Sequence, residues 1–176
     1  TEPRVFERFE TAGSIWAEWD NPFDPGQVAL DGEFRAPDGS VVVMPGFFFR
    51  PYARSLAGGF ERLEPRGQSQ WRVRMTPTRA GTWQWRWRVT TPAGRFDTEW
   101  EPFEVAPAAP GRHGFLRRSP LDGRYLRHDD GTPYVAIGQN LAWYDGRGTF
   151  AYDDWIAKLA AEGAPDIGTR RTDVDI

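Results

Sequence analysis

Apolar and polar residues alternate strictly along two segments near the middle of the chain. In the first, Trp71, Val73 and Met75 alternate with arginines, and in the second, three tryptophans between residues 83 and 87 alternate with glutamine and arginine. Because successive side chains of a strand point to opposite faces, each segment has one apolar and one charged face. We therefore expect two strands that lie on a hydrophobic core. The predicted core residues are Trp71, Val73, Trp83, Trp85 and Val89.

Shorter runs with the same period flank these two segments and are separated by turn residues. Further strands are predicted at 3–9, 28–35, 40–44, 46–50 and 96–105. Residues 52–69 are rich in Gly, Arg, Glu and Pro, so a long irregular loop is expected there. About seven short strands at this spacing are typical of an antiparallel sandwich. The expected fold class is therefore all-β, with an immunoglobulin-like antiparallel β-sandwich in residues 1–106.

A short stretch containing two prolines follows this region. Residues 107–114 include Pro107 and Pro110, and we interpret them as a stiff linker between domains. Beyond the linker, apolar residues at 115–116 and 125–126 bracket a turn-rich stretch, which predicts a hairpin.

A strand followed by a helix is predicted between residues 134 and 164. The strand is expected at 134–138, and the helix is expected to carry Asp153 and Asp154 in its first turn, where the helix dipole favours acids. Gly163 is expected at the left-handed position that ends many helices. The apolar stripe predicted for this helix is Trp155, Ile156 and Leu159.

A single strand–helix unit cannot bury its own apolar faces, because a parallel strand needs partners on its edges and cover on both sides. We expect residues 115–164 to be the truncated start of a second domain built from repeated strand–helix units, and the polar residues 165–176 to be a disordered tail. The family resemblance given below implies that this second domain is a (β/α)8 barrel. The uncovered segment 134–164 is also a predicted surface for self-association.

Charge and composition exclude several classes of function. The net charge is −3 with mixed signs, so no basic field is present for nucleic acid or for an anionic membrane. The chain has no cysteine, which excludes disulfides, thiolate metal sites and a cysteine nucleophile. His113 and His128 lie outside any metal-ligand pattern, and neither a metal nor a cofactor is expected.

Several motifs, in order, resemble the immunoglobulin-like domain of unassigned function at the N-terminus of many bacterial glycoside hydrolases, followed by the entry into a cellulase-like barrel. The matching segments are 21–24, 77–83, 103–105, 130–134, 138–143 and 159–164. The resemblance implies a secreted or periplasmic bacterial enzyme that acts on a polysaccharide or oligosaccharide with two carboxylates. In such barrels the catalytic carboxylates sit on later strands. We therefore expect this chain to hold no catalytic residue and to be inactive by itself.

The candidate binding residues follow from the same resemblance and from the tryptophan pattern. In a whole enzyme, Asn140, Trp143 and Tyr144 would follow the first barrel strand and line a sugar subsite, unless Trp143 packs under its loop instead. Trp16 and Trp19 flank a turn-rich loop and are candidates for exposed sugar contacts. Two other functions stay open: a stand-alone carbohydrate-binding module, and a structural domain without a ligand.

Overall fold

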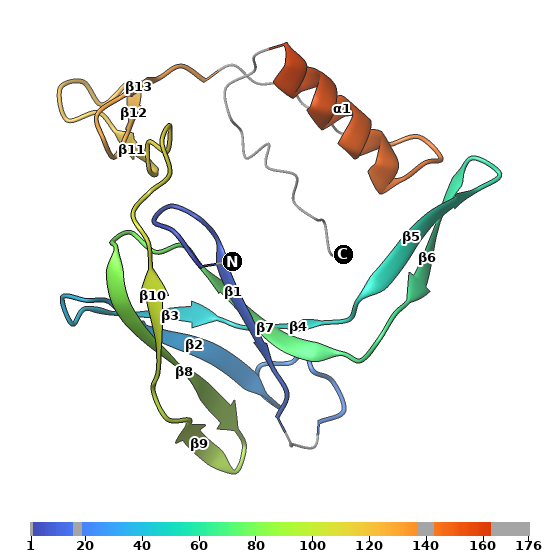
Figure 1. Ribbon diagram of the computed structural model, residues 1–176. Coiled ribbons are helices and arrows are strands. Elements are labelled where there is room, and N and C mark those ends of the chain that lie inside the picture. Colours follow the sequence, from blue (N-terminus) through green and yellow to red (C-terminus); the bar gives the residue numbers. More distant parts are fainter. Residues whose placement is uncertain (1, 16–18, 137–142, 163–176) are drawn as a thin grey trace. The chain divides into compact units, whose positions relative to one another are not determined.

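The computed structural model describes residues 2–15, 19–136 and 143–162. Two compact units share the chain (Figure 1). The first contains Thr1–Phe49 and Ser69–Phe115, and the second contains Arg50–Gln68 and Leu116–Ile176. The predicted domain boundaries at residues 106 and 115 stay a prediction.

The first unit contains a five-stranded antiparallel sheet. Its order is β10-β8-β2-β3, and β9 pairs with β8. The strands are β2 (Ala29–Arg35), β3 (Val41–Pro45), β8 (Gly81–Thr91), β9 (Gly94–Asp97) and β10 (Glu101–Val105). Strands were therefore correctly predicted near 28–35 and 40–44, whereas the single strand expected at 96–105 is divided between β9 and β10.

A three-stranded sheet faces the first one. Its order is β1-β7-β4, with β1 (Phe9–Gly13), β7 (Gln70–Met75) and β4 (Phe47–Phe49). The strand predicted at 3–9 is wrong, because Phe6 has a φ of 62° and the regular ladder starts only at Phe9. Gly46 carries the chain from β3 in one sheet to β4 in the other. Its N–H donates to the Leu30 carbonyl at 2.7 Å, and a Cβ at this position would overlap the same oxygen.

The two sheets bury one core between them. Phe34, Leu30, Val73 and Val89 are almost fully buried, and a Cβ on Gly32 would lie 2.7 Å from Val73 of the opposite sheet. The sheets therefore approach closely at Gly32. These packed antiparallel sheets agree with the expected all-β class.

Four of the five predicted core residues are buried: Trp71, Val73, Trp83 and Val89. Trp85 is half-buried and packs against the core from its margin, with its ring 6.5 Å from that of Phe34 and 5.4 Å from that of Trp87. Trp87, two residues later in the same strand, is buried although it was not among the predicted core residues.

The second unit contains a hairpin where the irregular loop was expected at 52–69. Strand β5 (Tyr52–Ala57) pairs with β6 (Phe60–Pro65) in a two-stranded sheet. Gly58 and Gly59 have φ angles of 61° and 82°, which is the geometry of a two-residue hairpin turn. The expectation of a loop is therefore wrong.

The rest of the second unit is a three-stranded sheet and a helix. The sheet has the order β11-β12-β13, with β11 (Leu116–Arg118), β12 (Leu126–His128) and β13 (Pro133–Tyr134). The predicted hairpin after the linker is confirmed by the β11–β12 pair. Strand β13 pairs with β12 in the antiparallel sense and ends at Tyr134, so the strand expected at 134–138 is wrong for its described part.

Helix α1 (Thr149–Ala161) confirms the predicted helix but not its details. Because it begins at Thr149, Asp153 and Asp154 fall in its second turn, and its first turn has no acid of its own. Trp155 and Leu159 are half-buried, Ile156 is 42% exposed, and Ala151 takes the buried position. Gly163 lies outside the described residues. In the described part of the chain, no helix is long and apolar enough to cross a membrane.

Candidate functional site

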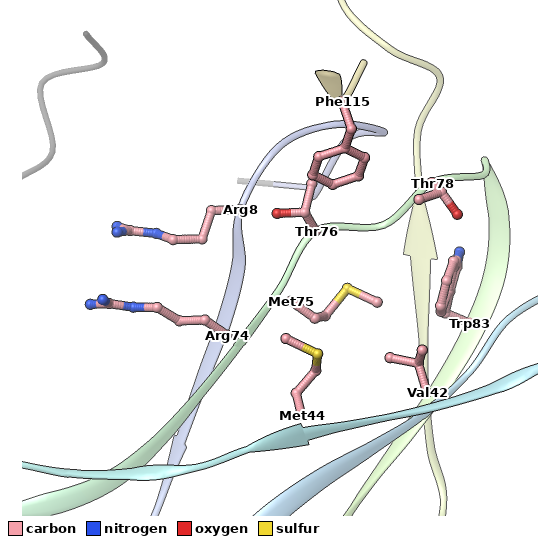
Figure 2. Close-up of a pocket in the computed structure, with 9 residues that line it drawn as sticks. All are labelled: Arg8, Val42, Met44, Arg74, Met75, Thr76, Thr78, Trp83 and Phe115. Atoms are coloured by element: carbon pink, nitrogen blue, oxygen red, sulfur yellow. The ribbon is translucent and has the colours of Figure 1, made fainter. Parts of the chain in front are cut away.

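An apolar groove of about 500 Å³ opens in the first unit. Met44 of β3 and Met75 of β7 lie side by side at its centre (Figure 2). Trp83 lies on one side of the two methionines. Arg8 and Arg74 lie on the other side, and their guanidinium groups point away from the groove. These are the two methionines of the chain. The groove is lined by Arg8, Val42, Met44, Arg74, Met75, Thr76, Thr78, Trp83 and Phe115.

The groove has the size of a small ligand site but little polar chemistry. The indole N–H of Trp83 donates to the Arg79 carbonyl at 2.9 Å, so its polar group is already used. Arg74 is ion-paired with Glu10. None of the nine lining residues is a carboxylate, a histidine or a cysteine. The groove can therefore accept an apolar group, but it holds no acid, base or thiol nucleophile of a kind that catalysis commonly uses.

The outer face of the five-stranded sheet carries an ion-pair network. Glu33 of β2 is buried and contacts Arg86 at 2.7 Å and Arg88 at 2.9 Å. Arg86 also contacts Asp97 at 3.0 Å. A hydrogen bond from Arg95 holds the pKa of Asp97 below its usual value. Each of the two carboxylates is therefore held in place by guanidinium groups and has a structural role.

The second unit joins its hairpin to the start of its helix. The carboxylate of Glu61 in β6 accepts from the Thr149 N–H at 3.1 Å and from the Thr149 hydroxyl. Arg54 of β5 donates to the same hydroxyl at 2.6 Å and to Asp153 at 2.9 Å. These contacts are long-range, because Glu61 and Arg54 precede Thr149 by 88 and 95 positions in the sequence. We call this set the hairpin–helix junction.

Exposed aromatic residues lie beside the helix. Trp143 is 91% exposed and Tyr144 is 64% exposed. The rings of Tyr144 and Tyr152 meet edge-on at 6.1 Å, and those of Tyr152 and Trp155 meet at 5.4 Å. The arrangement leaves Trp143 free to stack on a flat apolar surface such as a sugar ring.

A family comparison adds to this geometry. Residues 2–90 match the family model described as Domain of unknown function (DUF5060). The chain belongs to this family. The DUF5060 match includes both sheets of the first unit up to β8 and the whole β5–β6 hairpin, while helix α1 lies beyond it.

One solved structure shares the fold of the DUF5060 chain. It is a crystal structure of a candidate glycoside hydrolase from Bacteroides vulgatus, with a TM-score of 0.51 and 21% sequence identity. The likeness covers 76% of this chain and 21% of that protein, so the chain spans about a fifth of its length. No curated protein matches the chain.

The predicted site residues that the structure describes belong to different units of the DUF5060 chain. Trp19 is half-buried, with its ring edge-on to those of Phe48 and Trp71, at 6.4 Å and 6.3 Å. Trp143 and Tyr144 are in the second unit. Trp16 and Asn140 lie outside the described residues. Among the described residues, no cluster of three His, Cys, Asp or Glu side chains could hold a metal ion.

Sequence reasoning missed the hairpin–helix junction. Its residues carry no motif, because Arg54 and Glu61 look like ordinary surface charges. The Gly58-Gly59 pair between two short runs was the signal for a hairpin. Nothing in the sequence pairs that hairpin with Thr149, because the contact is long-range.

Proposed function

We propose that the chain is an accessory, non-catalytic part of a longer glycoside hydrolase. The observation that carries the proposal is the structural likeness to a candidate glycoside hydrolase. This likeness covers 76% of the chain, whereas the DUF5060 match ends at residue 90. The likeness therefore takes in sequence beyond the family match. That protein is about five times longer than the matched part, which leaves ample length for a catalytic domain.

The geometry of the described residues supports an accessory role. Glycoside hydrolysis needs two carboxyl groups that face each other across the bond, about 5–10 Å apart. The buried carboxylate, Glu33, is held by two arginines, and Glu61 is committed to the start of a helix. Both are engaged by structural partners, and neither lines the groove.

The finer assignment is also a proposal. We assign the first unit to an immunoglobulin-like sandwich and residues 115–164 to the start of a (β/α)8 barrel in a secreted or periplasmic bacterial enzyme. Short antiparallel strands in two facing sheets support the sandwich. In the whole enzyme, Trp143 and Tyr144 would contact the glycan, which their exposure of 91% and 64% supports.

Two assays of the purified chain test the proposal. We expect no release of reducing ends from mannan, cellulose or pectin-derived oligosaccharides above a buffer control, and turnover would overturn the accessory role. Affinity electrophoresis in the same glycans tests the alternative of a stand-alone carbohydrate-binding module. Retardation that is abolished by Trp143→Ala and kept by Leu121→Ala, a matched change at a 96% exposed apolar side chain, would favour that alternative.

A further inference from the structure

We infer that the β5–β6 hairpin is a docking arm of the DUF5060 domain, whose partner is the N-terminus of the first helix that follows the domain. Glu61 and Arg54 of the hairpin complete the first turn of α1. The inference concerns residues of this chain alone and does not depend on the glycoside hydrolase assignment.

The start of α1 lacks the groups that a helix normally uses to begin. The first N–H groups of a helix have no partner inside it and are usually capped by a preceding Ser, Thr, Asp or Asn. Here the cap position is Gly148, which has no side chain, and the first turn contains no acid. Glu61 supplies both missing features, because its carboxylate accepts from the Thr149 N–H at 3.1 Å and places a negative charge at the positive end of the helix dipole.

Thr149 and Arg54 complete the junction. The Thr149 hydroxyl donates to Glu61 and accepts from Arg54 at 2.6 Å, so both its donor and its acceptor function are used. Arg54 also donates to the carboxylate of Asp153, one turn later in the helix, at 2.9 Å. Its guanidinium group lies 4.6 Å from the centre of the Phe150 ring. The hairpin therefore contacts Thr149, Phe150 and Asp153, all within the first five residues of the helix, through hydrogen bonds, an ion pair and packing.

Two glycines make room for the hairpin. The Glu61 N–H donates to the Gly146 carbonyl at 3.1 Å, and a Cβ on Gly146 would lie 3.0 Å from the Phe60 ring. A Cβ on Gly148 would overlap the Glu61 carboxylate, and its φ of 58° also favours glycine. The loop before α1 is thus shaped to the hairpin as well as bonded to it.

Neither element is expected to be stable without the other. A lone two-stranded hairpin is marginal in water, and so is an isolated helix of 13 residues. Leu56 and Phe60 of the hairpin are 49% and 60% exposed, so burial of its own apolar residues contributes little. Through the junction, the hairpin and the helix depend on each other for their stability. The hairpin lies within the DUF5060 match, whereas the helix lies beyond it.

Hydrogen exchange of the full chain tests the inference. We expect Glu61→Gln to lower the protection of amides in 149–161 by about tenfold, the range of a lost helix cap. Glu64→Gln is the matched control, because Glu64 lies exposed on the same strand and should leave protection unchanged. Amides of β8 report global stability and should keep their protection in both variants.

A change on the helix side distinguishes docking from a local effect. We expect Gly148→Ala to lower the protection of amides in the hairpin, at 52–65, although no residue of the hairpin is altered. If Gly148→Ala fails to fold, Thr149→Val is the second helix-side variant, because it removes the hydroxyl that contacts Glu61 and Arg54. Arg54→Ala, with Arg62→Ala as its control on the partner strand, is a second hairpin-side variant and is followed through the amides in 149–161. The inference would be overturned if Glu61→Gln left the amides of the helix as protected as in the wild type and the helix-side variant did the same for the amides of the hairpin. Glycan turnover by the chain would overturn the proposed function and leave this result standing.

Discussion

Glu33 shows how a single residue fixes the charged face of the main sheet. Its side chain is 11% exposed although it projects from the face opposite the core, because Arg86 and Arg88 close over it at 2.7 Å and 2.9 Å. A carboxylate removed from water to this degree is tolerated only with such partners. Removing it would leave two guanidinium groups crowded on one patch of the sheet.

We expect Glu33→Ala to lower the free energy of unfolding by about 3 kcal/mol, as for a broken buried ion pair. Urea unfolding followed by tryptophan fluorescence measures it. Glu64→Ala, at an exposed position, should change the same quantity by less than about 0.5 kcal/mol. Equal unfolding midpoints for Glu33→Ala and the wild type would contradict the structural role of Glu33.

Three aspartates that are paired with arginines make the stability of the fold depend on pH in a known direction. The pKa of Asp97 is lowered by its hydrogen bond to Arg95, that of Asp122 by Arg124, and that of Asp145 by Arg147. A carboxylate whose pKa is lower in the folded state stabilises the fold fully above its usual pKa of 3.8. That contribution disappears as the pH falls through the lower folded value.

We therefore expect the urea midpoint to fall as the pH is lowered from neutral to about pH 3. Asp97→Asn should reduce the size of this fall, because one of the responding carboxylates is then absent. Glu64→Gln serves as the control. A midpoint that is the same at both pH values would show that these ion pairs do not contribute to folding.

Strand β8 shows how burial differs along one element. Trp83 and Trp85 point to the same face, but Trp83 is 4% exposed and bonds to the Arg79 carbonyl, whereas Trp85 lies half-buried at the margin. The same truncation therefore removes different amounts of packing at the two positions.

We expect Trp83→Ala to lower the free energy of unfolding by about 4 kcal/mol, as for a large core truncation. Trp85→Ala should cost clearly less, and chemical denaturation of the two variants side by side measures the difference. A larger loss for Trp85→Ala would mean that the margin of the sheet matters more than its centre.

The elements that sequence reasoning predicted well are those in which one face is buried. Strands β2, β7 and β8 alternate because Leu30, Phe34 and Val73 must face the core while their neighbours lie on the charged outer faces of the sheets. The β5–β6 hairpin was missed because its side chains are largely exposed on both faces, so no such alternation is imposed. The helix was predicted but its start was not, because the group that begins it belongs to a residue 88 positions earlier.

At the scale of the whole molecule, the path of the chain is the main finding. It leaves the first unit after Phe49, returns at Ser69 and leaves again after Phe115, so three peptide connections join the two units. The predicted linker at 107–114 is close to only one of them. The hairpin is covalently part of the N-terminal half of the sequence, yet it packs in the unit that contains the C-terminal half.

This path predicts an unusual response to a cut backbone. A protease site introduced in 108–111 would divide the chain into an N-terminal piece that keeps the hairpin and a C-terminal piece that keeps α1. We expect the two pieces to migrate as two bands in denaturing gels but as one species in native size-exclusion chromatography. The same cut in Gly148→Ala should give two separate species, and separation of the unsubstituted pieces would contradict the prediction.

The chain would then behave as a heterodimer whose subunits are encoded in one reading frame. Such a pair can be expressed as two polypeptides and assembled by mixing, with an affinity set by Glu61, Arg54 and Thr149 rather than by the length of a tether.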